Sequence, residues 1–221
     1  MHQFTSLSLD AIPDETTLLN FRHLFEKHQL THALFAAVRQ HLSDKGLMLK
    51  QGIIVDATPI HAPSSTKNAP RERDPDIYQT KKGNQWYFGM KAHIGIDAQS
   101  GLVYHVAGTA ANVADVTMVD QLLHGEEIDA FGDAGFTGVH KRAKHQSRAV
   151  RWQIAMRPDQ RKALTYSVDD RQIRLIETVK AKIRAKVEHP FRVIKQQFGY
   201  LKTRYRGLKK NTAQLITRCL G

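Results

Sequence analysis

Cysteine is nearly absent from this sequence, and its scarcity excludes several kinds of protein. The 221 residues contain one cysteine, Cys219. A single thiol cannot form an internal disulfide framework or a cysteine-based zinc site, and it is typical of a reducing compartment. The chain also has no run of about 18 apolar residues, and MHQFTSLSLD lacks the basic and apolar regions of a secretory signal. We therefore expect a cytoplasmic protein with no membrane partner.

Acidic residues are also scarce in the C-terminal part of the chain. From Thr178 to Gly221 the sequence has one carboxylate, Glu188. Residues 139–221 hold 22 Lys and Arg against 5 Asp and Glu, whereas residues 1–138 hold 11 against 16. A block this basic predicts a polyanionic partner, most often nucleic acid. The alternative is a solvated basic surface with no specific partner.

Several common catalytic motifs are missing. The sequence has no G-x-x-x-x-G-K-[ST] and no G-x-S-x-G, and its 12 histidines form no H-E-x-x-H pattern. His140 and His145 lie among Lys and Arg, where a second cation is disfavoured. These absences turn attention to the carboxylates.

The spacing of apolar residues predicts both helices and strands. Residues 14–45 have helical periodicity, and Gly46 ends that region. The predicted strands are residues 52–58, 86–97, 102–109, 128–135 and 150–157, and the later helices are residues 113–124, 138–147 and 170–197. Residues 62–85 contain three prolines and are predicted to form a long loop. Trp86 and Tyr87 are expected in the core, with stacking on bases as the alternative.

The order of these elements predicts the fold class. Three consecutive strands followed by alternating helices and strands indicate a mixed α/β sheet with helices on both faces. This order matches the ribonuclease-H-like arrangement, in which the first three strands form an antiparallel meander. We expect a partial helical region over residues 1–48 and this α/β domain over residues 49–221. The helical region is expected to pack on the main domain, and a DNA-reading module is the alternative.

Three carboxylates are candidates for a metal site. Asp56 and Asp133 are predicted to end two neighbouring strands, and two adjacent carboxylates repel each other unless a cation lies between them. Mg²⁺ or Mn²⁺ prefers such hard oxygen ligands. On the last helix, Arg184, Glu188 and Lys195 share one face, which suits a third metal ligand flanked by phosphate-binding cations. Pro190 predicts a kink just past Glu188.

Simpler roles remain open for each of these groups. Arg184 and Glu188 are spaced for an exposed i,i+4 ion pair. Asp56 and Asp133 are also compatible with turn-forming roles. Other acids are expected to be structural or solvated, namely Asp97 in the hairpin turn, Asp115 in a first helical turn, and Asp74 and Asp76 in the long loop.

Several segments together resemble one known family. These are 53-IIVDATPIHAPSSTKN-68, 80-TKKGNQWYFGMKAHIGID-97, 109-TAANVADVT-117, 132-GDAGFTG-138 and 184-RAKVEHPFRVIKQQFGYLKTRYRGLKKNTAQL-215. They resemble bacterial insertion-sequence transposases of the DDE type, in the insertion-sequence-five group, from about Leu9 to Leu215. The resemblance implies that Asp56, Asp133 and Glu188 bind two divalent ions, Mg²⁺ or Mn²⁺. Arg184, Glu188 and Lys195 fit the family signature Y-x(2)-R-x(3)-E-x(6)-K, whereas Ala181 occupies the tyrosine position.

The resemblance also implies an activity and partners. Such an enzyme cleaves phosphodiesters at element ends and transfers the strand into target DNA, generally as a dimer, in the bacterial cytoplasm at the nucleoid. DNA contacts are expected from Arg184, Lys195, Lys81, Lys82 and Arg192. Against the family pattern the chain is expected to be truncated at both ends. One alternative is therefore an inactive DNA-binding or dimerising remnant that inhibits an intact copy, and another is a nuclease without a joining step.

Overall fold

The computed structural model describes residues 13–220, so the predictions about the first ten residues lie outside the described part of the chain. The helices are α2 (Glu15–Lys27), α3 (Leu30–Asp44), α4 (Val119–Leu122), α5 (Pro158–Ala163), α6 (Val168–Arg184), α7 (Glu188–Arg192) and α8 (Leu208–Arg218). The strands are β1 (Gly52–His61), β2 (Tyr78–Lys82), β3 (Gln85–Asp97), β4 (Val103–Ala110), β5 (Asp129–Gly132) and β6 (Arg151–Ile154). Short 3-10 turns replace the helix predicted at residues 138–147.

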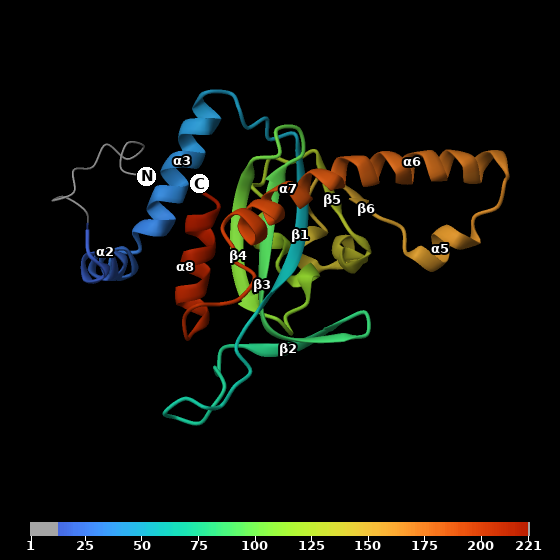
Figure 1. The fold of residues 1–221 in the computed structure, drawn as a ribbon. Coiled ribbons are helices and arrows are strands. Elements are labelled where there is room, and N and C mark those ends of the chain that lie inside the picture. The colour runs from blue at the N-terminus through green and yellow to red at the C-terminus, as the bar shows by residue number, and fades with distance from the viewer. Residues whose placement is uncertain (1–12, 221) are drawn as a thin grey trace.

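One mixed sheet organises the molecule (Figure 1). Strand β3 pairs antiparallel with β1 on one side and with β4 on the other, which confirms the predicted meander. Strand β5 then runs parallel to β1, and β6 runs parallel to β5. Strand β2 was not predicted. It pairs with the first residues of β3, and the two form a hairpin that projects below the rest of the sheet in Figure 1.

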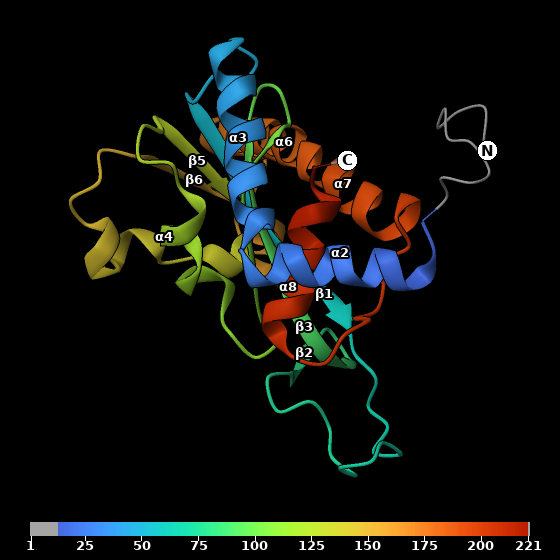
Figure 2. The same cartoon turned by 90° about the vertical axis from the view of Figure 1, so that its left-hand side faces the viewer.

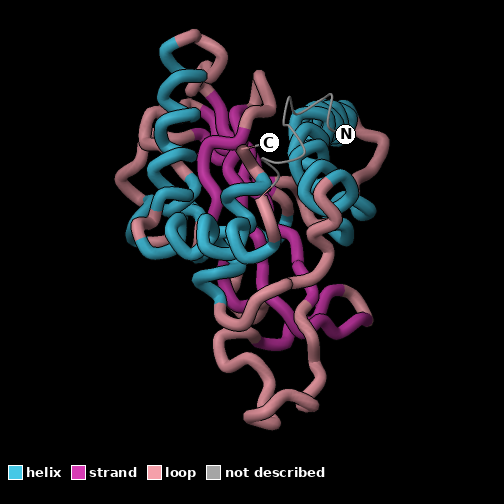
Figure 3. The backbone as a smooth tube through the Cα atoms, turned by 60° about the vertical axis from the view of Figure 1, so that its left-hand side comes forward, coloured by secondary structure: helices cyan, strands magenta, loops and turns pink. Residues whose placement is uncertain are grey.

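Alternation along β1 divides the core into two layers. Ile54 and Ile60 pack with α7 and α8, whereas Ile53 and Val55 pack with α4 and the turns after β5. Successive side chains of a strand point to opposite faces, so a buried central strand supplies both layers. Figure 3 shows the strands with helices on either side. The predicted mixed sheet with flanking helices is confirmed, and the architecture is ribonuclease-H-like.

The N-terminal helices pack on the main body as expected. In Figure 2, α2 and α3 lie in front of α8. The Arg22 guanidinium lies 4.1 Å from the centre of the Tyr205 ring, and Arg39 donates a hydrogen bond of 3.2 Å to the Tyr104 carbonyl. None of the helices in the described part of the chain is long and apolar enough to cross a membrane. The domain boundary at residue 48 stays a prediction.

Two predicted boundaries were wrong. Residues 62–85 are not one loop, because β2 occupies its last part and pairs with β3. The strand signal there is weak, since Tyr78 and Thr80 are its two β-forming residues beside polar ones. Asp56 does not end β1, because β1 continues to His61 while it pairs with β3. Pro59 is tolerated within β1 although proline lacks a backbone donor.

The predicted long C-terminal helix is interrupted. After α6, a 3-10 turn spans Ala185–Val187, α7 follows, and a π turn spans Val193–Gln197. The irregular stretch therefore begins immediately before Glu188, and not just past it as predicted. Proline at position 190 has no N–H for the Lys186 carbonyl, so the regular α pattern fails in the turn that precedes it.

Candidate active site

Strand β1 carries Asp56 to the face of the sheet that α7 covers. Asp56 is separated from Ile54, Thr58 and Ile60 by two or four residues along β1. Because side chains alternate between the two faces of a strand, these four share one face. The Asp56 side chain is partly exposed, and its Oδ1 accepts a hydrogen bond of 2.7 Å from the Ala57 N–H. Asp56 lies within β1, so the regular antiparallel pairing of β1 with β3 fixes the position of its backbone.

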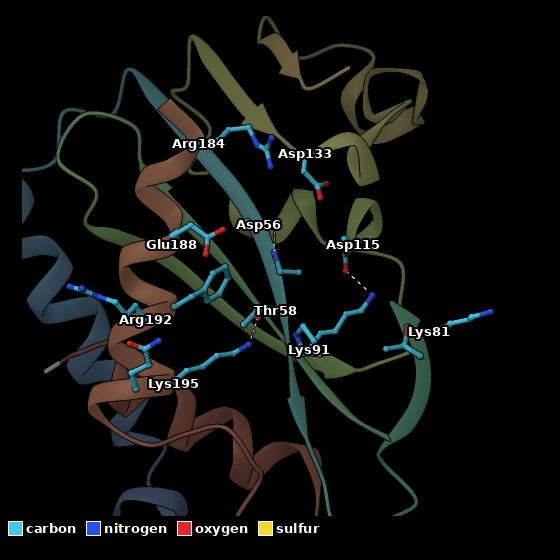
Figure 4. A pocket seen from close by; sticks show the side chains of 15 residues that line it. Asp56, Thr58, Lys81, Lys91, Asp115, Asp133, Arg184, Glu188, Arg192 and Lys195 are labelled. Carbon is cyan, nitrogen blue, oxygen red and sulfur yellow. Dashed lines mark hydrogen bonds and ion pairs between the residues drawn. The ribbon is translucent and has the colours of Figure 1, made fainter. Parts of the chain in front are cut away.

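Asp133 is placed by the neighbouring strand. Strand β5 pairs with β1 as far as Ile54 opposite Phe131, and Asp133 follows two residues later, level with Asp56. Its Oδ1 accepts a hydrogen bond of 2.8 Å from the Gly135 N–H, so Asp133 also caps a turn. A Cβ at Gly135 would lie 2.9 Å from this oxygen, which explains why glycine fits there. In Figure 4 the Asp133 carboxylate points into the same space as Asp56.

Glu188 approaches from the helical layer. It is the first residue of α7 and is exposed, whereas Val187 and Phe191 beside it are buried against the sheet. In the described part of the chain Arg184 and Glu188 form no ion pair with each other, although their i,i+4 spacing allows one. The 3-10 turn between them changes their relative direction. Both side chains reach the pocket that Asp56 and Asp133 line.

One open pocket of about 470 Å³ thus gathers almost all the predicted residues. This is far more than the ~30 Å³ of a water molecule, so the pocket has room for a ligand of several atoms. Lys195 donates a hydrogen bond of 2.5 Å from Nζ to Thr58 Oγ1, across from the π turn to β1. The predicted residues on the pocket wall are Asp56, Asp133, Glu188, Arg184, Arg192, Lys195 and Lys81. The Lys82 side chain lies outside what the structure describes.

Two charged residues on the pocket wall, Lys91 and Asp115, were not predicted as site residues. Lys91 Nζ donates a hydrogen bond of 2.9 Å to Asp115 Oδ1 and another of 2.8 Å to the Val113 carbonyl. Asp115 does begin a short helical turn, as predicted, but it also faces the pocket (Figure 4). The available signal was Lys91 itself, a lysine within the apolar strand segment 86–97.

Electrostatics single out Asp56 among these carboxylates. The pKa of Asp56 is raised from 3.8 to about 6, mainly by burial and also by the nearby Asp133 and Glu188 carboxylates. The Ala57 N–H and the Arg184 guanidinium act in the opposite direction, because they stabilise the charged form. The three carboxylates repel one another, and a cation bound between them would offset this repulsion.

The donor set fits a hard divalent cation, although the ligands are not gathered tightly. Among the described residues, no three acidic, histidine or cysteine side chains form a ready-made metal cluster. Asp56, Asp133 and Glu188 instead face one another across the pocket. Carboxylate oxygens are the ligands that Mg²⁺ and Mn²⁺ prefer, and Mg²⁺ keeps several waters of its own. The fit therefore rests on the chemistry of the donors and on the raised pKa of Asp56.

Other acids have structural roles, and two that were predicted only to be solvated also form hydrogen bonds. Asp97 accepts hydrogen bonds from Leu49, Lys50, Gln99 and Ser100, so it organises the turn after β3 as expected. Asp74 and Asp76 were expected to be solvated. They accept hydrogen bonds from the Gly207 and Leu208 N–H groups at 2.6 and 3.1 Å. They therefore cap the start of α8, where the backbone N–H groups lack helical partners.

The sheet and the pocket define an α/β protein of ribonuclease-H-like architecture, with acidic and basic groups meeting at one site. The family model described as "Transposase DDE domain" matches residues 48–220, which is well over half of the chain. The chain belongs to this family, and a transposase function follows. No solved structure gives a significant match.

Proposed function

We propose that the protein is a DDE transposase that cleaves phosphodiesters at element ends and joins the freed strand to target DNA. The observation that supports this most is that Asp56, Asp133 and Glu188, which lie far apart in the sequence, line one pocket together with lysine and arginine side chains. The insertion-sequence-five group and the truncation remain predictions from the resemblance. The family match includes all three carboxylates, so it does not favour the inactive-remnant alternative.

In this proposal Asp56, Asp133 and Glu188 hold two divalent ions. When bound, such ions stabilise negative charge on the phosphate and lower the pKa of an attacking water. Arg184, Arg192 and Lys195 hold the non-bridging oxygens of the phosphate from the helical side, and Lys81 does so from the hairpin side. The pocket walls thereby fix the phosphodiester for in-line attack.

Two displacements at phosphorus account for the reaction. In the first, a water oxygen bonds to phosphorus, and the departing 3′ oxygen takes a proton to become a 3′-OH. In the second, this 3′-OH loses its proton as its oxygen bonds to a phosphorus of the target, and the 3′ oxygen of the target strand departs and takes up a proton. Neither step requires a covalent bond between the protein and DNA.

We also infer that the chain works as a homodimer through α6. Val168, Leu175, Ile176 and Val179 form an exposed apolar stripe on this helix, which projects from the body in Figure 1. The first turn of α6 carries Asp169 and Asp170, and its last turn carries Lys182. An antiparallel second copy of α6 would bury the stripe and bring opposite charges together.

The test of the catalytic proposal is a nicking assay. A supercoiled plasmid carrying the element ends should be nicked by the wild-type protein with Mg²⁺ and left intact in EDTA. Asp133→Asn should reduce nicking to the metal-free background, because the amide is a weak ligand for a hard cation. Asp159→Asn, an exposed acid on α5, is the matched control and should leave nicking unchanged.

The outcomes separate the alternatives. Equal nicking by wild type and Asp133→Asn would mean that the metal-site proposal is wrong. A wild-type protein that binds the ends but does not nick them would support the remnant. Nicking without joining, when a pre-cut end with a free 3′-OH is supplied, would indicate a nuclease.

A further inference from the structure

Trp86 is exposed at the hairpin beside the candidate active site. It lies in the second residue of β3, and 65% of its surface is accessible, although tryptophan is usually buried to a large extent. The expectation that Trp86 belongs to the core was therefore wrong. The surroundings of this tryptophan, next to a pocket for nucleic acid, indicate what it does.

The neighbouring aromatic residues already have partners. The Tyr87 ring packs 4.8 Å from His61, and its hydroxyl donates 2.9 Å to the Gln85 side chain. The Arg73 guanidinium lies 5.3 Å from the centre of the Phe88 ring. Among the described residues no aromatic ring or cation packs on Trp86 in this way. Its π-face is available for a ligand.

The position of Lys81 indicates what that ligand is. Lys81 is directly opposite Trp86 in the β2–β3 ladder, so the two side chains project from the same face of the hairpin. Lys81 also lines the pocket with the three carboxylates. A cation for phosphate beside an aromatic face for a base is the combination that binds single-stranded nucleic acid.

We propose that Trp86 stacks on an unpaired base of the DNA strand whose phosphate lies in the pocket. This rests on the proposed function, because that function brings DNA to the site. A base inside a duplex is already stacked on both sides, so the ring selects a base at a strand end or one turned out of the helix. Trp86 is thus a positioning residue that holds the strand beside the carboxylates.

A fluorescence experiment tests the stacking without any cleavage. The chain has two tryptophans, so Trp152→Phe leaves Trp86 as the single emitter. A labelled single-stranded oligonucleotide in EDTA should quench this emission as it binds, whereas a blunt closed hairpin of equal length should quench it far less. The complementary variant Trp86→Phe retains Trp152 and should show no quenching.

Binding measured by anisotropy separates stacking from charge. Trp86→Ala should weaken single-strand binding about tenfold, with an unchanged dependence on salt, and Trp86→Tyr should recover most of the loss. Lys81→Ala should instead reduce the slope of log K against log salt by about 0.7, because one phosphate contact is lost. Tyr166→Ala, which removes an exposed aromatic on the segment before α6, is the matched control and should bind like wild type.

Three results would overturn the proposal. The first is unchanged Trp86 emission at saturating single-stranded DNA, and the second is wild-type affinity of Trp86→Ala for both DNA forms. The third is loss of self-association in Trp86→Ala with DNA binding intact, which would assign the ring to a second copy of the chain. Since every readout is metal-free, failure of the nicking assay alone would count against the proposed function and not against the stacking.

Discussion

Asp56 lies where its surroundings destabilise the ionised carboxylate. Its pKa is raised to about 6, first by burial and then by Asp133 and Glu188. A raised carboxyl pKa means that the folded state binds the proton more tightly than the unfolded chain does. Folding stability is therefore lost as the pH rises from about 4 to about 6, and the loss is constant above that range. Such a cost at a pocket is typical of a functional carboxylate.

The residue-scale prediction follows from this sign. Asp56→Asn should raise the free energy of unfolding above pH 6 by about 1–3 kcal/mol in EDTA, because the amide carries no charge to bury. The gain should shrink as the pH falls toward 4, where wild-type Asp56 is protonated. Urea unfolding at several pH values measures it. An equal effect at every pH would contradict the assignment of this cost to the Asp56 charge.

Asp97 provides a control of opposite sign. Burial acts to raise its pKa, but hydrogen bonds from Ser100, Gln99 and Lys50 outweigh burial and lower the pKa. Asp97→Asn should therefore destabilise the protein at neutral pH. This stabilising contribution should disappear as the pH falls below the usual carboxyl range.

At the scale of elements, the irregular helical segment determines how the site is assembled. The 3-10 turn Ala185–Val187 winds more tightly than an α-helix, and the π turn Val193–Gln197 winds more loosely. The two departures act in opposite directions, so Arg184, Glu188 and Lys195 all still reach the pocket. Apolar periodicity predicts a helix here, but it does not reveal where the hydrogen-bond pattern changes. Pro190 is recognisable in the sequence as a helix-disrupting residue, but the 3-10 turn lies before Glu188 and not after it.

Asn211 holds α8 to the segment that precedes it. Its side chain is fully buried, accepts hydrogen bonds from Tyr200, Arg204 and Tyr205, and donates to the Tyr205 and Gly207 carbonyls. The same segment pairs with the end of β1, where the Thr203 N–H donates 2.7 Å to the His61 carbonyl. Asn211 therefore joins α8 to the strand that carries Asp56.

The element-scale prediction concerns this asparagine. Asn211→Ala should lower the free energy of unfolding by about 2–4 kcal/mol, because several buried backbone groups lose their partners at once. Denaturant unfolding followed by circular dichroism measures the change. Asn112→Ala, at an exposed asparagine, should cost less than about 0.5 kcal/mol. Similar losses in both variants would contradict the role assigned to Asn211.

At the scale of the whole molecule, α6 is a long helix that leaves several large apolar side chains exposed. One face is anchored, because the buried Glu177 accepts hydrogen bonds from the Met156 N–H and from Lys180. The opposite face exposes Leu175 and Val179. The sequence shows a long amphipathic helix, but periodicity does not tell which apolar side chains lack a partner.

The whole-molecule prediction is that α6 mediates self-association. Leu175→Gln with Val179→Gln should weaken the dimer by about tenfold or more, equivalent to at least about 1.4 kcal/mol, because apolar burial is lost while helix propensity is kept. Sedimentation velocity across a range of concentrations measures this. Ile128→Gln, at another exposed apolar residue, should not change the association. If the double variant and wild type sediment alike, α6 is not the interface.

The sequence by itself determined the mixed sheet, its helical layers and the identity of the candidate carboxylates. Alternation and helical spacing record which side of each element is buried, and acids on neighbouring strands stand out because like charges repel unless a cation lies between them. The structure added the β2 hairpin, which pairs with adjoining residues of β3 and has only a weak strand signal in the sequence. Tertiary structure alone decided the wall formed by Lys91 and Asp115 and the exposure of Trp86. A local pattern holds no information about what a side chain will meet across the fold.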